Sequence, residues 1–272
     1  MSPRRAALGL VLVLALALVV AVGCGVLGDD EPEPRVDGPG MTADEAVHTV
    51  PGRELFRADF ETGDLGQWDG GQAVADDRIQ VVDDPVDQGR YAGRFEVRDG
   101  DNPIGFGDRA ELQIGSGEEE GQDRWYAWST MFDPSFPTSD AWQVVTQWHV
   151  EDIDGTPPVA FYVIGDEIAL QTNPHDGDGT PAGEPAIHWS APLDRGRWHH
   201  FRLHVRWSGD DELGLIQLWA DGVEATGEIH TRTLYPGHAA YLKQGYDRRS
   251  GEPQTGVVYH DALRASEAVP AA

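Results

Sequence analysis

From residue 55 onward, short apolar runs alternate with turn-forming residues. The runs are rich in β-branched and aromatic side chains, and Gly, Pro, Asp or Asn separates them. No long amphipathic helical pattern interrupts them. The spacing predicts an all-β fold of two antiparallel sheets, a β-sandwich of the jelly-roll (concanavalin-like) type. We expect strands in the ranges 55–61, 78–84, 90–99, 125–132, 142–150, 158–165, 167–173, 199–208, 213–222 and 241–246.

The range 199–208 shows the alternation most clearly. Phe201, Leu203 and Val205 fall on one face of the expected strand, because successive side chains of a strand point to opposite sides. The pair Asp221 and Gly222 follows the next apolar run and predicts a tight hairpin.

The first 24 residues follow a different pattern. Arg4 and Arg5 precede an unbroken apolar run that ends in AVGC at residues 21–24. This ending resembles a bacterial lipoprotein signal and implies that Cys24 becomes the lipidated first residue of the mature chain. The alternatives are an uncleaved membrane anchor or ordinary secretion with cleavage nearby. We therefore expect an extracytoplasmic protein, anchored by lipid to the outer face of the cell membrane or otherwise secreted.

Residues 25–52 are rich in Asp, Glu, Pro and Gly and hold few large apolar side chains. Such a segment buries too little surface to offset the entropy of ordering, so it predicts a flexible linker. Residues 53–272 are the expected folded domain. Because Cys24 is the only Cys of the chain, we expect no disulfide.

The charge limits the possible partners. The chain has a formal net charge of −27, and removal of residues 1–24 would leave 18 Lys and Arg against 47 Asp and Glu, since 18 − 47 = −29. A surface of this sign repels nucleic acid and anionic lipid, so neither is an expected partner, apart from the lipid anchor itself. An acidic polysaccharide would bind only at a locally basic site. We expect a monomer.

Three short pieces of the chain place polar residues on a common strand face. Each piece alone is also typical of an ordinary solvent-exposed strand. Each holds two polar side chains at positions i and i+2: Arg109 and Glu111, Gln147 and His149, and Tyr241 and Lys243.

Together, and in this order, the pieces resemble the strand motifs of the jelly-roll polysaccharide lyases of the alginate lyase, glucuronan lyase and heparin lyase I types. The C-terminal GVVYHDALR also resembles the closing strand of the heparin-lyase-like branch. The resemblance covers about residues 53–266 and implies a lyase that requires no cofactor. The three motifs read Arg109-Ala110-Glu111-Leu112, Gln147-Trp148-His149 and Tyr241-Leu242-Lys243-Gln244-Gly245-Tyr246.

The resemblance implies β-elimination on a polysaccharide that contains uronic acid. A base removes the weakly acidic proton at C5, the C4–O bond breaks, and the site must neutralise the neighbouring carboxylate while charge develops. By resemblance, Arg109 and Gln147 bind that carboxylate, since an Arg can donate two N–H groups to it. His149 is the expected base or its helper, and a Tyr is the expected acid. The expected substrate-binding residues are Lys243, Tyr241 and Arg248.

The position of the catalytic Tyr departs from the family pattern. In the family this Tyr usually lies four residues after the Lys, on the same strand face, and here that position is Asp247. Either a local bulge turns Tyr246 into the site, or the phenol is absent and the protein binds uronates without cutting them. We expect the bulge, with Tyr246 as the catalytic acid and Tyr241 as the fallback for that role.

A basic cleft on an acidic body would attract a polyanion rather than repel it. We expect that several cations gather near one concave face, namely Arg94, Arg109, Lys243, Arg248 and Arg249.

Metal-binding signals are weak. The loop 173–185 holds Asp176 and Asp178 among glycines and could bind Ca²⁺, but it lacks the downstream bidentate Glu of an EF-hand. His199 and His200 are adjacent at a strand start, where their side chains point apart, so we assign them to structure. We therefore expect no metal in the active site.

Two other functions are compatible with the sandwich scaffold. The main alternative is a non-catalytic carbohydrate-binding module for acidic polysaccharides. A glycoside hydrolase would need two carboxylates flanking the glycosidic bond, and the chain has no Glu-x-Asp-x-x-Glu signature.

Overall fold

The structure is a computed structural model that describes residues 47–268. The predicted signal with Cys24 and most of the predicted linker lie outside the described residues. A short 3₁₀ helix, η1 (Asp76–Arg78), interrupts a succession of strands. The strands are β1 (Arg53–Ala58), β2 (Gly70–Gln72), β3 (Ile79–Val82), β4 (Ala92–Val97), β5 (Asp108–Glu118), β6 (Asp123–Phe132), β7 (Ser139–Val150), β8 (Val159–Gly165), β9 (Glu167–Thr172), β10 (Ala186–Pro192), β11 (Trp198–Arg206), β12 (Leu215–Ala220), β13 (Val223–Glu224), β14 (Ile229–His230), β15 (Ala240–Arg248) and β16 (Gly256–Glu267).

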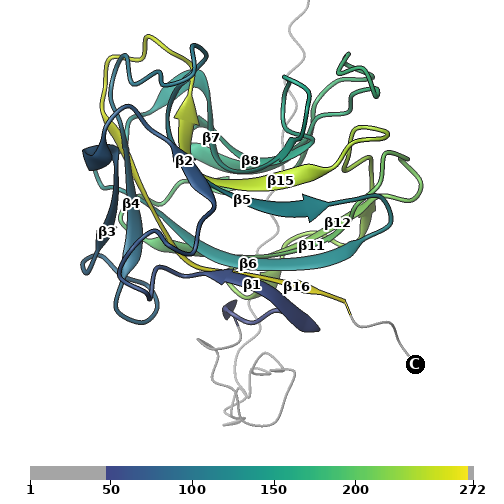
Figure 1. The fold of residues 1–272 in the computed structure, drawn as a ribbon, viewed down its shortest axis with the longest axis horizontal. Helices are drawn as coiled ribbons and strands as arrows, with labels where there is room; N and C mark the ends of the chain where they lie inside the picture. The colour runs from purple at the N-terminus through teal and green to yellow at the C-terminus, as the bar shows by residue number, and fades with distance from the viewer. Residues whose placement is uncertain (1–46, 269–272) are drawn as a thin grey trace, which may run out of the picture. The chain divides into compact units, whose positions relative to one another are not determined.

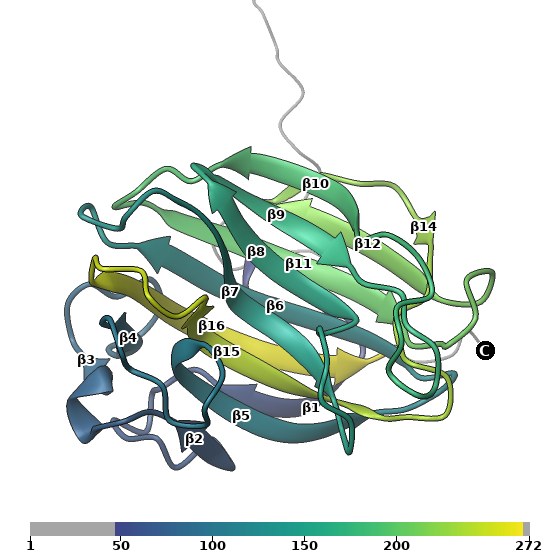
Figure 2. The ribbon, with the colours of Figure 1, turned by 90° about the horizontal axis from the view of Figure 1, so that it is seen from above.

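The strands form two antiparallel sheets (Figures 1 and 2). The nine-stranded sheet has the order β13-β12-β11-β6-β16-β4-β3, with β1 paired to β16 and β14 paired to β12. The seven-stranded sheet has the order β10-β9-β8-β7-β15-β5-β2. The predicted two-sheet jelly-roll sandwich is confirmed.

Aromatic side chains from both sheets make the core. Trp128 of β6 lies 6.1 Å from Trp148 of β7 and 5.0 Å from Phe161 of β8, measured between ring centroids. All three rings are almost completely buried. Burial of a side chain of this size contributes roughly 1.5–3 kcal/mol. Within residues 47–268, no helix has the length and apolarity needed to cross a membrane.

Two local predictions about strands and turns are confirmed. Phe201, Leu203 and Val205 of β11 are buried between the sheets, while the intervening side chains are only partly buried. Asp221 and Gly222 join β12 to β13 with φ angles of 51° and 79°. Two successive positive φ angles are those of the hairpin turn that Asp-Gly favours.

Contact with the sandwich begins before β1. His48 is buried, and the hydroxyl of Ser266 donates a hydrogen bond to the carbonyl of Pro51. Gly52 has φ +96°, and a Cβ there would come within 2.0 Å of the Glu267 carbonyl oxygen. Residues 48–52, which we expected in the linker, therefore pack on the folded domain.

Candidate active site

Three neighbouring strands of the seven-stranded sheet carry the predicted motifs. β15 pairs with β5 on one side and with β7 on the other (Figure 2). The register sets Lys243 opposite Gln147 and Tyr241 opposite His149. Directly opposed residues of antiparallel strands point to the same face. The polar side chains of the three motifs therefore come together on the outer face of this sheet.

Glu111 lies at the centre of this group. Its Oε2 accepts hydrogen bonds from Lys243 Nζ at 2.5 Å and from Arg109 Nη1 at 3.2 Å. Its Oε1 accepts one from Gln147 Nε2 at 2.5 Å. Lys243 and Glu111 are only 1% and 2% exposed. Burial disfavours ionisation of Glu111, but Lys243 and Arg109 hold its pKa below the ordinary value.

Asp247 completes the group, which we call the cation–carboxylate cluster (Arg109, Glu111, Gln147, Lys243 and Asp247). It lies opposite Arg109 in the register, and its Oδ2 is 3.0 Å from Arg109 Nη2. Burial, followed by the charge of Glu111, raises the pKa of Asp247 to about 8. Its Oδ1 is buried and has no hydrogen-bond partner within the described part of the chain.

The loop before β5 closes over one end of this cluster. Arg109 Nη2 donates a hydrogen bond to the carbonyl of Phe106 at 2.8 Å. Gly107 has φ +71°, and a Cβ there would lie 2.6 Å from Asp247 Oδ1. A residue with a side chain would clash with Asp247, so this close approach requires glycine.

His149 and Tyr241 form the more accessible end of the same face. His149 Nδ1 lies 2.9 Å from the carbonyl of Val150, to which it can only donate, so Nε2 keeps the lone pair. Burial, and then Lys243, lowers the pKa of His149. The Tyr241 ring is 5.7 Å from the His149 ring, and burial together with Glu111 raises the pKa of its phenol. A neutral imidazole thus stands beside a protonated phenol.

The prediction that a bulge turns Tyr246 into the site is wrong. A bulge does occur where β15 pairs with β7, between Gln244 and Asp247. The pairing of β15 with β5 runs through this region without a shift, so the side chains keep alternating. Tyr246 therefore faces the core. It is 0% exposed, packs on Phe136, and donates a hydrogen bond to Gln143 Oε1 at 2.5 Å.

The prediction that Arg248 binds substrate is also wrong, because Arg248 alternates with Asp247 along β15 and so lies on the opposite face from the cation–carboxylate cluster. It donates hydrogen bonds to the carbonyls of Gln254 at 2.6 Å and Glu252 at 3.0 Å, and so holds the loop between β15 and β16.

The expected gathering of five cations is also not found. Arg94 lies on β4 of the other sheet, and Arg249 is exposed and pairs with Glu252. Arg109 and Lys243 remain as the two cations of the predicted site.

The acidic residues of the predicted Ca²⁺ loop have protein partners, and the two adjacent histidines have different surroundings. Asp178 accepts a hydrogen bond from the Thr180 hydroxyl at 2.7 Å, and Asp176 lies 3.4 Å from Arg232. His199 and His200 do point apart: His199 is buried beside Phe201, while His200 lies with His48 and Asp87. A cavity of about 290 Å³ is lined by residues that include Leu55, Glu118 and Tyr126, and no residue of the cation–carboxylate cluster lines it.

Sequence reasoning missed Glu111 and Asp247 as members of the site. Glu111 carried a signal, because it follows Arg109 by two residues and must share its face. Asp247 carried the same signal relative to Lys243, but it was interpreted as a missing Tyr. Gln72 of β2 carried none. Its Oε1 accepts from Lys243 Nζ at 3.0 Å and from Arg109 Nη1 at 3.3 Å.

The chain matches a known protein family over most of the described residues. The family described as polysaccharide lyase matches residues 60–264. The chain belongs to this polysaccharide lyase family. No curated protein matches the chain in sequence.

Solved structures share the fold at low sequence identity. The endo-β-1,4-glucuronan lyase of the fungus Trichoderma reesei is similar with a TM-score of 0.65 and 16% identity, over 78% of this chain and 95% of that one. The family 7 alginate lyase A1-II′ is similar with a TM-score of 0.55 and 13% identity, over 71% and 85%. A glycoside hydrolase family 131 catalytic domain from Coprinopsis cinerea reaches a TM-score of 0.55 with 11% identity, over 81% and 96%. The fold alone therefore does not choose between elimination and hydrolysis.

Proposed function

We propose that the protein cleaves a uronic-acid-containing polysaccharide by β-elimination on the outer face of the seven-stranded sheet. The observation that carries the proposal is the convergence of Arg109, Gln147, Lys243, His149 and Tyr241 on that one face. Membership of the polysaccharide lyase family supports the reaction type. The choice of a uronate rests on the charges of the site.

The first step is binding of the substrate carboxylate. Arg109 and Lys243 are cations, and Glu111 is an anion that holds both of them in place. Because the pKa of Asp247 is raised to about 8, this group is mostly neutral at pH 7. The cluster then carries one net positive charge within a strongly acidic protein. Such a local field concentrates an anionic chain, and Arg109 with Gln147 supplies N–H donors to its carboxylate.

The second step is proton transfer. His149 Nε2 takes the C5 proton, and the electron pair of the C5–H bond forms the C4–C5 double bond while the C4–O bond breaks. The Tyr241 hydroxyl donates its proton to the leaving oxygen, and the imidazolium then returns a proton to the phenolate. The neutral imidazole and the protonated phenol are the forms that this sequence requires. Tyr241 takes the role that we had given to Tyr246, because Tyr246 is in the core.

Ultraviolet absorbance of the new double bond tests the proposal. The chain is incubated with alginate, glucuronan and heparin, and His149→Gln is compared with Tyr246→Phe. We expect absorbance to rise with at least one polymer, to be lost in His149→Gln, and to persist in Tyr246→Phe. A protein that binds a uronate polymer without any rise in absorbance would instead be a carbohydrate-binding module. Asp247 favours that second function, because it stands where the family resemblance implies the catalytic Tyr.

We also propose that the enzyme works outside the cytoplasm. Support comes from the sequence of residues 1–24, with its basic start, apolar run and Cys24. Fractionation of cells that express the chain or its Cys24→Ala variant tests this. We expect the chain in the membrane fraction and the variant to leave it, and a cytoplasmic location of the unmodified chain would contradict the proposal.

A further inference from the structure

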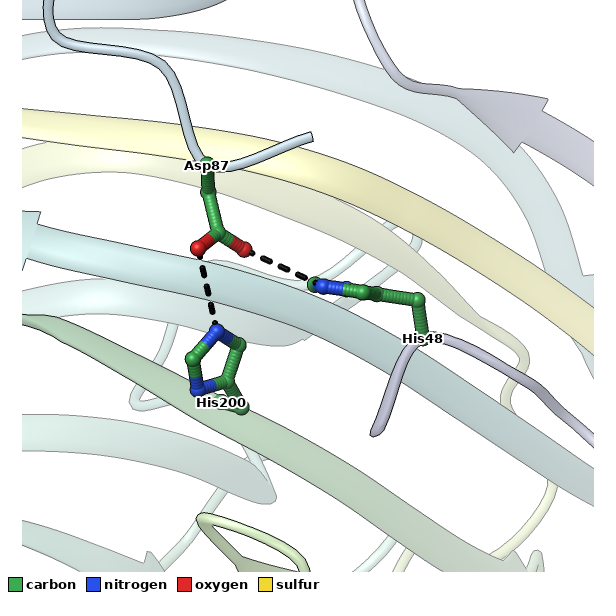
Figure 3. Close-up of side chains that lie close together, drawn as sticks. All are labelled: His48, Asp87 and His200. Carbon is green, nitrogen blue, oxygen red and sulfur yellow. Dashed lines mark hydrogen bonds and ion pairs between the residues drawn. The ribbon is translucent and has the colours of Figure 1, made fainter. Parts of the chain in front are cut away.

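A second polar group lies on the other sheet of the sandwich, and we call it the histidine cluster (His48, Asp87 and His200). His200 belongs to β11, Asp87 to the connection between β3 and β4, and His48 to the segment before β1. Figure 3 shows both imidazole rings directed at the Asp87 carboxylate from different sides. Three segments far apart in the sequence therefore meet at one point.

The distances fit a compact coordination site. His200 Nε2 lies 3.0 Å from Asp87 Oδ1, and His48 Nε2 lies 3.3 Å from Asp87 Oδ2. One ligand atom from each residue lies within 4.8 Å of the others. A tetrahedral zinc ion with bonds of about 2.0–2.2 Å keeps its ligand atoms about 3.3 Å apart. Small inward movements of two side chains would give that geometry.

Neighbouring groups orient these potential ligands. Asp221 Oδ1 lies 3.4 Å from His200 Nδ1, and a carboxylate at one ring nitrogen favours metal binding at the other. The hydroxyl of Ser129 donates to Asp87 Oδ2 at 2.6 Å. Asp261 Oδ2 accepts the backbone N–H groups of Asp87 at 3.0 Å and of the next residue at 2.9 Å. The Asp87 carboxylate is thus held in one place before any ion arrives.

We propose that His48, Asp87 and His200 bind a divalent transition metal ion, with Zn²⁺ as the best match. Two imidazoles and one carboxylate are ligands that suit zinc, whereas Ca²⁺ and Mg²⁺ prefer sites made of oxygen. The His200 and Asp87 side chains are 24% and 10% exposed, so an ion can reach them and water can take a fourth position.

The ion would have a structural role. It would join the segment before β1 to the nine-stranded sheet, while the cation–carboxylate cluster lies on the seven-stranded sheet. This inference therefore does not depend on the proposed lyase function.

Calorimetric titration of the metal-free chain with Zn²⁺ tests the proposal. The chain carries Cys24→Ser so that the thiol cannot bind the ion, and Ca²⁺ is titrated in parallel. We expect one Zn²⁺ per chain and no comparable binding of Ca²⁺. His200→Gln and His48→Gln should each weaken zinc binding by about 100-fold or more. The matched control is His204→Gln, because His204 lies on the same strand and pairs with Asp123 at 2.5 Å but belongs to no three-ligand group within residues 47–268.

Two further readouts keep the result clear if one variant folds poorly. Thermal unfolding at free Zn²⁺ of about 100 times Kd should show a rise in Tm of roughly 5–10 °C, absent in His48→Gln. Replacement by Co²⁺ should give the visible absorption of a tetrahedral site. Absence of binding by the unsubstituted chain, or binding that survives both His200→Gln and His48→Gln, would overturn the proposal.

Discussion

The two sheets carry polar clusters on their outer faces that are built in different ways. The cation–carboxylate cluster comes from directly paired strands, and its cations lie against Glu111 and Asp247. The histidine cluster comes from one strand, one connection and the segment before β1. Strand register fixes the first cluster, whereas loop packing fixes the second. The first has charged donors suited to an anionic substrate, and the second has ligands suited to a metal ion.

The largest expected effect is on the proposed catalysis at the outer face of the seven-stranded sheet. Tyr241→Phe removes the proposed proton donor, and kcat should fall by about 10²–10⁴-fold. Tyr246 lies five positions along the same strand, on its core face, so Tyr246→Phe should keep kcat and lose only stability through the hydrogen bond to Gln143. Steady-state kinetics and denaturant unfolding measure the two effects. Equal losses of kcat in both variants would contradict the assignment.

The next effect concerns the stability of the charged network. Glu111→Gln leaves Lys243 and Arg109 buried without their central carboxylate, which should lower the free energy of unfolding by about 3–5 kcal/mol. Glu54→Gln on the other sheet removes an exposed partner of Arg57 and should cost no more than about 1 kcal/mol. Urea unfolding compares them. Similar losses in the free energy of unfolding would contradict the claim that the buried charges of the first cluster stabilise the fold more than an exposed pair does.

A third effect comes from the different pKa values of two carboxyl groups on β5, Glu111 and Glu118. Unlike Glu111, Glu118 is hydrogen-bonded by the hydroxyls of Ser116 and Tyr126, and burial raises its pKa to about 7. The unfolded chain loses this proton near pH 4.5, so the free energy of unfolding should fall as the pH rises to 7, by about 3 kcal/mol in total. Urea unfolding measured between pH 4.5 and 7 should show this fall in the free energy of unfolding. In Glu118→Gln the part of the fall that Glu118 causes should be absent. An unchanged pH profile in the variant would contradict the assignment of this effect to Glu118.

The smallest effect is on substrate affinity at alkaline pH. Above pH 8, ionised Asp247 competes with the substrate carboxylate for Arg109, so KM for a uronate polymer should rise severalfold. Asp247→Asn cannot ionise, and its KM should stay constant over the same range. Kinetics between pH 7 and 9 test this. A rise of KM in both proteins would assign the effect to another group.

Strand alternation made much of the candidate active site predictable. The motif residues Arg109, Gln147, His149 and Lys243 each occupy an alternate position of a strand, and neighbouring strands brought those positions together. The same rule predicted the buried face of β11. These features depend only on local periodicity and on which strands pair.

The failures have a common physical cause. The bulge in β15 shifts its pairing with β7 but not with β5, and only the complete sheet shows that Tyr246 keeps facing the core. Arg248 was placed by its charge, whereas two loop carbonyls hold it. The meeting of His48 and Asp87 with His200 depends on how loops pack, and no sequence period records such contacts.

Cleavage of glucuronan, alginate or heparin in isotopically labelled water tests the central claim most directly. Elimination breaks the C4–O bond without adding water, so product masses should show an unsaturated end and no labelled oxygen from the cleavage. Incorporation of one labelled oxygen at each new end, or no cleavage of any uronate polymer by a folded chain that still binds one, would contradict the account.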